Sequence, residues 1–199
     1  LAIVDGLWRG QPFEFSGNNY STLTVSALAG ADQIDLISLG SSQTNNPAIN
    51  LNGGTEDDTP RVRSTSLNTG TVTLTGNAGN DLFQLFDAGN TVENIAGPVV
   101  VDGTDGNVGG NTDTLTIVDS GDLTADLNVV IAASSPGSSA DYFIDGINSV
   151  ASGDVTFRNV DVLNYTSTAA DDRIDGRFES TVPLHDLNTV NLSGWTGAD

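Results

Sequence analysis

The stretch VTLTGNAGNDLFQL, residues 72–85, contains the pattern that decides the fold of this chain. Polar and apolar residues alternate in VTLT and again in LFQL, as in β-strands that turn one face toward a core. Between them, GNAGND supplies Gly, Asn and Asp, which favour tight turns. The stretch therefore predicts a strand, a Gly-rich turn that ends at Asp81, and a second strand.

Weaker copies of this strand–turn–strand pattern recur along the chain. Turns of this kind are spaced about 28 residues apart, and they end at Asp32, Asp58, Asp81, Asp113, Asp141, Asp172 and Asp199. Before five of these turns, two apolar residues recur in one register: Leu23 and Val25, Ile49 and Leu51, Val72 and Leu74, Leu163 and Tyr165, and Val190 and Leu192. One such unit is too small to bury its apolar face alone, so it must stack on its neighbours.

A repeat of this kind is typical of a β-solenoid. We predict an all-β fold, a right-handed parallel β-helix with coils of about 28 residues, because coils of that length need about three strands. Stacked coils would place Val25, Leu51 and Leu74 in one internal ladder, with the polar residues between them facing outward. The alternative is a β-sandwich, which also contains alternating strands but has no reason to repeat one turn at one offset.

Composition narrows the functional classes. The 199 residues include 26 acidic and 6 basic residues, so the net charge is −20. Such a surface repels nucleic acid and anionic lipid and attracts metal ions, so we expect no nucleic-acid partner. Apolar runs are shorter than a membrane span, so we expect no membrane insertion. The chain has no Cys, and its stability must come from another source, such as repeated hydrogen bonding or bound metal.

We treat residues 1–199 as a single domain. The chain starts with Leu1 and contains no Met, so we expect a processed form or a piece of a longer protein. Residues 5–32 resemble residues 175–199, since both run from Asp-Gly to Gly-Ala-Asp. Either the chain holds about one higher-order repeat of a tandem array or one fibre subunit, or any two coils simply look alike. Open sheet edges at solenoid ends favour the first interpretation, with end-to-end continuation into further copies.

The repeated Asp residues are candidate metal ligands. Side chains one coil apart lie about 4.8 Å from each other, where carboxylates repel unless a cation, backbone N–H groups or raised pKa values compensate. One hypothesis is a column that binds Ca²⁺, richest in carboxylates near TEDD and VDGTDGN. The other is that each Asp caps its own turn through a side-chain oxygen. The candidate ligands are Asp32, Asp58, Asp81, Asp113, Asp141 and Asp172.

The segment GNAGNDLFQ, residues 76–84, also fits the nine-residue template G-G-x-G-x-D-x-U-x, in which U is a large apolar residue. Asn77 replaces the second Gly. With INLNGGTEDD, DTLTIVDSGD and NVDVLNYTSTAADDRIDG, it resembles the large bacterial surface and secreted proteins built from β-strand repeats, relatives of hemolysin-type (RTX-like) calcium-binding proteins. The resemblance implies an extracellular or cell-surface location, adhesive or scaffold roles and calcium dependence. The tandem nonapeptides of the hemolysin type are missing here.

We therefore expect a non-enzymatic structural or adhesive module of an extracellular fibre, sheath or giant surface protein, stabilised by Ca²⁺. Its expected partners are copies of itself and surface glycans. The alternative is a β-helix protein that binds or cleaves polysaccharides, whose site would need a base and cations. Arg61 and Arg63 share a strand face, Arg173 and Arg177 are close in sequence, and His185 is the only His. We assign no catalytic residue.

Overall fold

The computed structural model describes residues 20–38, 46–65, 70–104, 110–126, 128–133, 142–147, 155–177 and 187–194. Asp141, His185 and most of the two similar end segments lie outside these ranges. The described residues form strands β1 to β14 and no helix, so the predicted all-β class is confirmed. They contain no helix that is long and apolar enough to cross a membrane.

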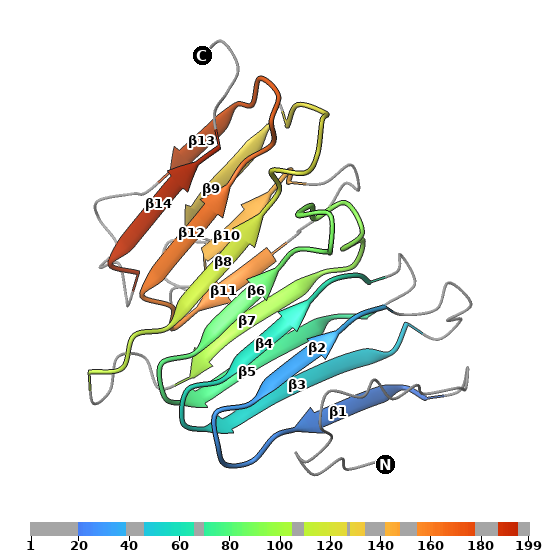
Figure 1. Ribbon diagram of the computed structural model, residues 1–199, viewed down its shortest axis with the longest axis vertical. Coiled ribbons are helices and arrows are strands. Elements are labelled where there is room, and N and C mark those ends of the chain that lie inside the picture. The colour runs from blue at the N-terminus through green and yellow to red at the C-terminus, as the bar shows by residue number, and fades with distance from the viewer. Residues whose placement is uncertain are drawn as a thin grey trace.

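One sheet has eight strands in the order β1-β3-β5-β7-β11-β10-β9-β13 (Figure 1). These strands are β1 (Thr22–Ser26), β3 (Ala48–Thr55), β5 (Val72–Ala78), β7 (Val99–Thr104), β9 (Val129–Ala133), β10 (Tyr142–Asp145), β11 (Val155–Arg158) and β13 (Ile174–Arg177). Neighbouring strands pair in parallel except at β10, which is antiparallel to both β9 and β11.

The other sheet has six strands in the order β14-β12-β8-β6-β4-β2, and all its pairings are parallel. They are β2 (Gln33–Leu36), β4 (Thr59–Val62), β6 (Leu82–Leu85), β8 (Thr114–Val118), β12 (Val162–Thr166) and β14 (Thr189–Ser193). The sheets lie face to face, with β1 and β2 at one end of the molecule and β13 and β14 at the other (Figure 1).

Consecutive strands up to β8 alternate between the two sheets. Each passage through both sheets, here called a circuit, therefore adds one strand to each sheet, rather than the three strands per coil that the repeat length suggested. Outside the named strands, the described residues add only isolated parallel bridges, between Ala29 and Thr55 and between Thr65 and Ile95. The remaining residues of each circuit go into corners and connections.

The regular alternation breaks after β8. The chain enters β9, reverses through β10, and only then returns in β11 to pair with β7. It next forms β12 beside β8. Two additional strands are thus inserted into the larger sheet, which explains why the sheets differ in strand number.

This insertion corrects the predicted register in the second half of the chain. Leu163 and Tyr165 were aligned with Leu23 and Val25, but they lie on β12 in the six-stranded sheet, whereas Leu23 and Val25 lie on β1 in the other sheet. Val190 and Leu192 on β14 are displaced in the same way. The strands of both sheets have the same alternation and the same Gly/Asp corners. A strand of one sheet can therefore be aligned in sequence with a strand of the other sheet, which is an error of half a circuit.

The predicted internal ladder is confirmed in the first half. Val25 pairs with Leu51, Leu51 with Leu74, and Leu74 with Val101. Leu51 is 2% exposed, and Leu74 and Val101 are 0% exposed. The ladder continues from Val101 to Phe157 on β11. Facing it, the six-stranded sheet contributes its own buried rows: Phe83, Leu115 and Leu163, and Leu85, Ile117 and Tyr165.

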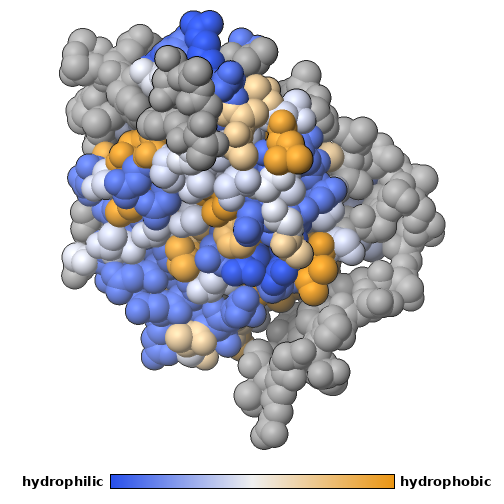
Figure 2. Space-filling model, turned by 45° about the horizontal axis from the view of Figure 1, so that its top comes forward, coloured by the Kyte–Doolittle hydropathy of each residue, from blue (hydrophilic) through white to orange (hydrophobic). Residues whose placement is uncertain are grey.

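The surface is mainly hydrophilic where the described residues face the viewer in Figure 2, and hydrophobic side chains are scattered in small groups. Leu28, Ile37 and Leu123 are the large hydrophobic residues that are exposed in the described part. Together with the net charge of −20, this surface favours solubility and interaction with cations.

Leu74, at the centre of the ladder, should contribute strongly to the free energy of unfolding. Replacing Leu74 by Ala removes a fully buried side chain, and we expect a loss of about 2–5 kcal/mol in the free energy of unfolding, measured by urea denaturation. The neighbouring Thr73 faces outward and is half-buried, so Thr73→Ala should cost less than about 0.5 kcal/mol. Equal losses in the two variants would contradict the described core.

Candidate metal centre

Four of the predicted Asp residues form a column at one corner of the fold. The carboxylate of Asp58 accepts a hydrogen bond from the backbone N–H of Asp32 at 2.8 Å. In the same way, Asp81 accepts from the N–H of Asp58 at 2.8 Å, and Asp113 accepts from the N–H of Asp81 at 2.9 Å. These bonds join successive circuits, so each carboxylate caps the turn of the neighbouring circuit. The capping hypothesis had placed each cap within the turn of the same Asp.

The next member of the column is Asp161, whose carboxylate accepts from the N–H of Asp113 at 2.9 Å. Asp161 was not predicted, because no Gly-rich turn precedes it; its only signal is that it lies two residues before Leu163, as Asp81 lies before Phe83. The predicted Asp141 lies outside the described residues, although β10, which follows it, runs antiparallel to the neighbouring strands.

The predicted assignment of Asp172 to this column is wrong. Its carboxylate accepts a hydrogen bond from the N–H of Asp126 at 2.8 Å, in the connections that lead into β9 and β13. The reason is the half-circuit slip: Asp172 follows β12 of the six-stranded sheet, whereas the column lies where the chain enters that sheet.

Glycine makes room for the buried carboxylates of the column. A Cβ atom on Gly53 would lie 2.4 Å from Oδ2 of Asp58, and one on Gly76 would lie 2.1 Å from Oδ2 of Asp81. Asn77, which replaces the second Gly of the nonapeptide template, has a φ angle of 76°, and Asn tolerates this left-handed backbone better than most residues. The Gly-rich turn is thus a steric requirement of an inward-pointing Asp.

The charge of the column is compensated by backbone donors. Asp58 is 1% exposed, and burial raises its pKa, as do the nearby carboxylates of Asp32, Asp57 and Glu56. The hydrogen bond from the N–H of Asp32 acts in the opposite direction and favours the ionised form. Of the three means of compensation that the sequence left open, the structure therefore shows two at Asp58, a backbone N–H donor and a raised pKa.

Substitutions at Asp58 should separate hydrogen bonding from charge. Asp58→Ala leaves the partly buried N–H of Asp32 without its acceptor, so the free energy of unfolding should fall by about 1–3 kcal/mol. Asp58→Asn retains a side-chain oxygen that can accept the same hydrogen bond and should cost less. Chemical denaturation in buffer that contains a chelator measures both. An equal loss in the two variants would show that the charge, not the acceptor, is required.

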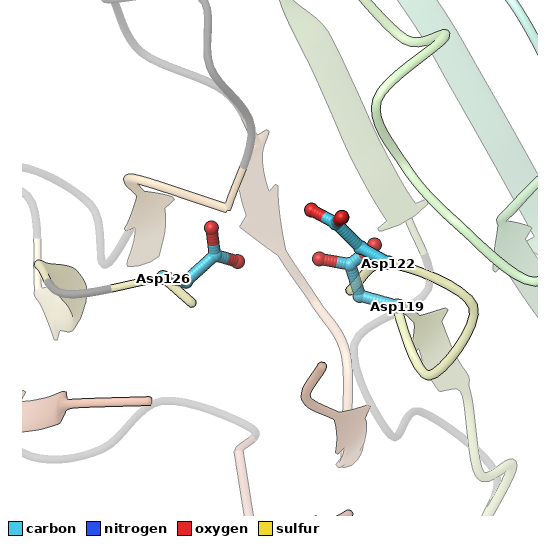
Figure 3. A group of neighbouring side chains, drawn as sticks. All are labelled: Asp119, Asp122 and Asp126. Carbon is cyan, nitrogen blue, oxygen red and sulfur yellow. The ribbon is translucent and has the colours of Figure 1, made fainter. Parts of the chain in front are cut away.

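A second group of carboxylates, here called the Asp119 cluster, follows β8. Potential ligand oxygens of Asp119, Asp122 and Asp126 all lie within 4.8 Å of one another. In Figure 3, Asp126 faces the other two side chains from a separate part of the connection. Asp119 is 0% exposed, and Asp122 and Asp126 are half-buried. This cluster could hold a metal ion.

Strand alternation and a tight turn bring the cluster together. Leu115 and Ile117 point into the core from β8, and Asp119 occupies the next inward position. The turn returns at once, since the N–H of Asp122 donates to the carbonyl oxygen of Asp119 at 3.0 Å. The sequence signal that prediction overlooked is therefore the position of Asp119. It stands two residues after Ile117, where the alternation of β8 would place another inward-facing apolar residue.

Asp119 and the nearby Asp172 each accept hydrogen bonds on one carboxylate oxygen. Asp119 accepts from the N–H of Val92 at 3.1 Å. Asp172, besides its bond to Asp126, accepts from the hydroxyl of Thr168 at 2.6 Å. The Oδ2 atoms of Asp119, Asp126 and Asp172 are buried and have no hydrogen-bond partner among the described residues.

Burial and mutual repulsion perturb this cluster strongly. Burial, followed by the charge of Asp126, raises the pKa of Asp119 to about 8, although the N–H of Val92 opposes the shift. Burial also raises the pKa of Asp126 to about 6, with the charge of Asp172 adding to it. Asp119 and Asp126 are close enough to share one proton, but when both are ionised neither can donate. The ionised pair therefore requires a cation.

The cations considered for a polysaccharide site lie elsewhere. Arg61 hydrogen-bonds Gln84 and lies over the ring of Phe86, with 4.9 Å between its guanidinium carbon and the ring centroid. Arg63 pairs with Asp35 at 2.8 Å. In β13, Arg177 pairs with Asp175 at 2.7 Å. Each of the paired arginines therefore has a local partner within its own sheet.

Comparison with known protein families, curated proteins and solved structures gives no match to this chain.

The Asp119 cluster should make the metal-free protein less stable as the pH rises. The folded protein holds a proton on Asp119 up to about pH 8 and one on Asp126 up to about pH 6. The unfolded chain releases both at about pH 4. Because the folded state binds more protons in this window, its stability is greatest at the acidic side and falls as the pH rises toward 8.

This decline can be measured as the melting temperature at pH 5 and pH 8 with a chelator present. Asp119→Asn should reduce the decline, because Asn has no proton to release. Asp145→Asn removes an exposed carboxylate on β10 and the same formal charge, so it controls for general charge repulsion. The same decline in all three proteins would contradict a role of the cluster.

Proposed function

We propose that this chain is a β-solenoid module with a non-enzymatic, structural or adhesive role in an extracellular fibre, sheath or giant surface protein. The observation that carries the proposal is the repeated parallel register: Val25, Leu51, Leu74 and Val101 occupy one ladder on consecutive strands of one sheet. Parallel pairing of circuits favours a parallel β-helix over a β-sandwich, whose sheets are antiparallel. Solenoids of this kind provide long, regular surfaces more readily than closed catalytic pockets.

The extracellular location rests on the resemblance to hemolysin-type repeat proteins. The turn at residues 76–84 supports it, since Asn77 adopts the left-handed backbone that Gly would provide in the nonapeptide template. The acidic surface and the absence of Cys are compatible with a secreted protein stabilised by hydrogen bonds and metal. We propose that Ca²⁺ stabilises the module, and the acidic Asp119 cluster supports this part of the proposal.

Copies of the chain are the proposed partners. Within the described ranges, β1 and β2 at one end and β13 and β14 at the other each have a strand neighbour on one side only. Inward-facing residues of these strands, such as Val25 and Leu192, are half-buried, whereas their counterparts in central strands are buried.

The strand directions suit head-to-tail assembly. Strand β13 runs parallel to β9, and two antiparallel steps through β10 make β9 parallel to β11, β7 and β1. In the other sheet, β14 runs parallel to β2 through an unbroken series of parallel pairs. A translated copy could therefore extend both sheets at once by parallel pairing, the heterologous contact that generates fibres.

Thr24 allows a test of this edge. The N–H of Ala27 donates to the carbonyl oxygen of Asn52 on β3, and alternate residues of a parallel strand bond to the same neighbour. The N–H of Thr24 therefore points away from β3. Thr24→Pro should block pairing at this edge while leaving the β1–β3 bonds intact; Thr24→Ala retains the N–H as control.

We expect wild-type protein and Thr24→Ala to form larger species with rising concentration in sedimentation velocity, and rods in negative-stain images. Thr24→Pro should remain smaller under the same conditions. A wild-type protein that stays monomeric at all concentrations would contradict head-to-tail assembly. Release of products from polygalacturonate or alginate would contradict a non-enzymatic role.

A further inference from the structure

We propose that the Asp119 cluster binds one Ca²⁺ ion through Asp119, Asp122 and Asp126, with the carboxylate of Asp172 and the hydroxyl of Tyr165 beside it. The ion would join the connection between β8 and β9 to the next circuit, which contains β12 and β13. This inference deepens the proposed function by naming the calcium site, and it rests on the calcium stabilisation proposed there. It does not depend on head-to-tail assembly or on location.

Three buried carboxylate oxygens at the site lack hydrogen-bond partners. The Oδ2 atoms of Asp119, Asp126 and Asp172 come from two separate connections and have no hydrogen-bond partner in the described part of the chain. Among these described residues, none of the three carboxylates forms an ion pair with an arginine. Buried charges without a counter-charge are strongly unfavourable, so these carboxylates must either retain protons or bind a cation.

Tyr165 provides a second and independent observation. Its side chain is 0% exposed, and its hydroxyl has no hydrogen-bond partner among the described residues. It pairs with Ile117 on the inner face, and Asp119 is the next inward residue after Ile117. The hydroxyl is within reach of the charges of Asp126, Asp119 and Asp172, which, after burial, raise its pKa further. An apolar Phe would satisfy the packing, so the hydroxyl points to a polar ligand.

The ligand chemistry selects Ca²⁺. All candidate donors are hard oxygens, and the chain has no Cys and a single His, so a zinc-type site is not available. The ligand oxygens of Asp119, Asp122 and Asp126 lie within 4.8 Å of one another, so one central ion can lie about 2.4 Å from all three, the distance that Ca²⁺ prefers. Mg²⁺ requires about 2.1 Å and near-ideal octahedral geometry and gives up its waters reluctantly, so a cluster of protein carboxylates suits it less well than Ca²⁺.

The Asp column is a poorer site by the same criteria. The Oδ2 atom of Asp58 is also buried without a hydrogen-bond partner among the described residues. However, it lies against Gly53, where a Cβ atom would be only 2.4 Å away, and within the described residues only the Asp119 cluster brings three ligand oxygens within 4.8 Å of one another. The proposed calcium site therefore lies not in the column, where the chain enters the six-stranded sheet, but at the other end of these strands, where the chain leaves β8. There the ion would hold the connection that precedes the inserted strands β9 and β10.

Calorimetric titration of the chelator-treated full-length chain with CaCl₂ tests the site. We expect binding of one ion per chain and a higher melting temperature. Asp126→Asn should weaken binding by about tenfold or more, because affinity follows ligand charge. Asp58→Asn and the exposed Asp145→Asn should retain wild-type affinity. Loss of binding in Asp58→Asn alone would place the ion in the column and overturn the proposal.

Terbium luminescence provides a readout that does not depend on stability. Tb³⁺ replaces Ca²⁺ at oxygen sites, and a nearby tyrosine sensitises its emission. We expect emission that CaCl₂ suppresses and that Tyr165→Phe strongly reduces, with an unchanged circular dichroism spectrum. If Asp126→Asn fails to fold, this measurement on wild type and on Asp122→Asn still decides the question.

Each remaining outcome is informative. Absence of both calcium heat and terbium emission in the wild-type protein overturns the site. Assembly in sedimentation experiments would then still support the proposed structural function without calcium. Conversely, calcium binding by a protein that never assembles would support the site and contradict head-to-tail assembly.

Discussion

The structure depends on one hydrogen bond, from the backbone N–H of a corner Asp to the carboxylate of the Asp in the next circuit. It joins Asp32 to Asp58, Asp58 to Asp81 and Asp81 to Asp113, at 2.8 to 2.9 Å. Because the acceptor is buried, the bond holds each corner at one height and one rotation relative to its neighbour. The strands that follow therefore start in register, and their apolar residues fall into continuous ladders.

That constraint explains why some corner positions must be Gly and others need not be. Gly76 is needed because Asp81 lies where its Cβ atom would be. Other corner residues take the left-handed backbone without being Gly, including Leu28, Glu56 and Thr104. The corner geometry is therefore more regular than the sequence that forms it. It also accommodates the inserted strands β9 and β10, after which Asp161 restores the same hydrogen bond across a separation of 48 residues.

The first half of the column could be predicted because its signals are local. Asp32, Asp58, Asp81 and Asp113 each end a recognisable turn, and apolar residues precede or follow them at fixed spacing. Asp161 and the Asp119 cluster escaped prediction for different reasons. Asp161 has no Gly-rich turn. Asp119 meets Asp126 only through the fold of the β8–β9 connection, and Asp172 comes beside them from a second connection that is distant in sequence.

The sequence by itself determined the all-β class, the strand–turn–strand unit and the ladder of Val25, Leu51 and Leu74, since alternation and turn chemistry act over a few residues. Only the tertiary structure decided which sheet each strand joins. Strands of both sheets have the same alternation, and the choice depends on pairing energies between distant segments. It therefore also decided that one oxygen of each column carboxylate accepts a backbone N–H. It likewise brought buried polar oxygens from separate connections together around Asp119 and Tyr165.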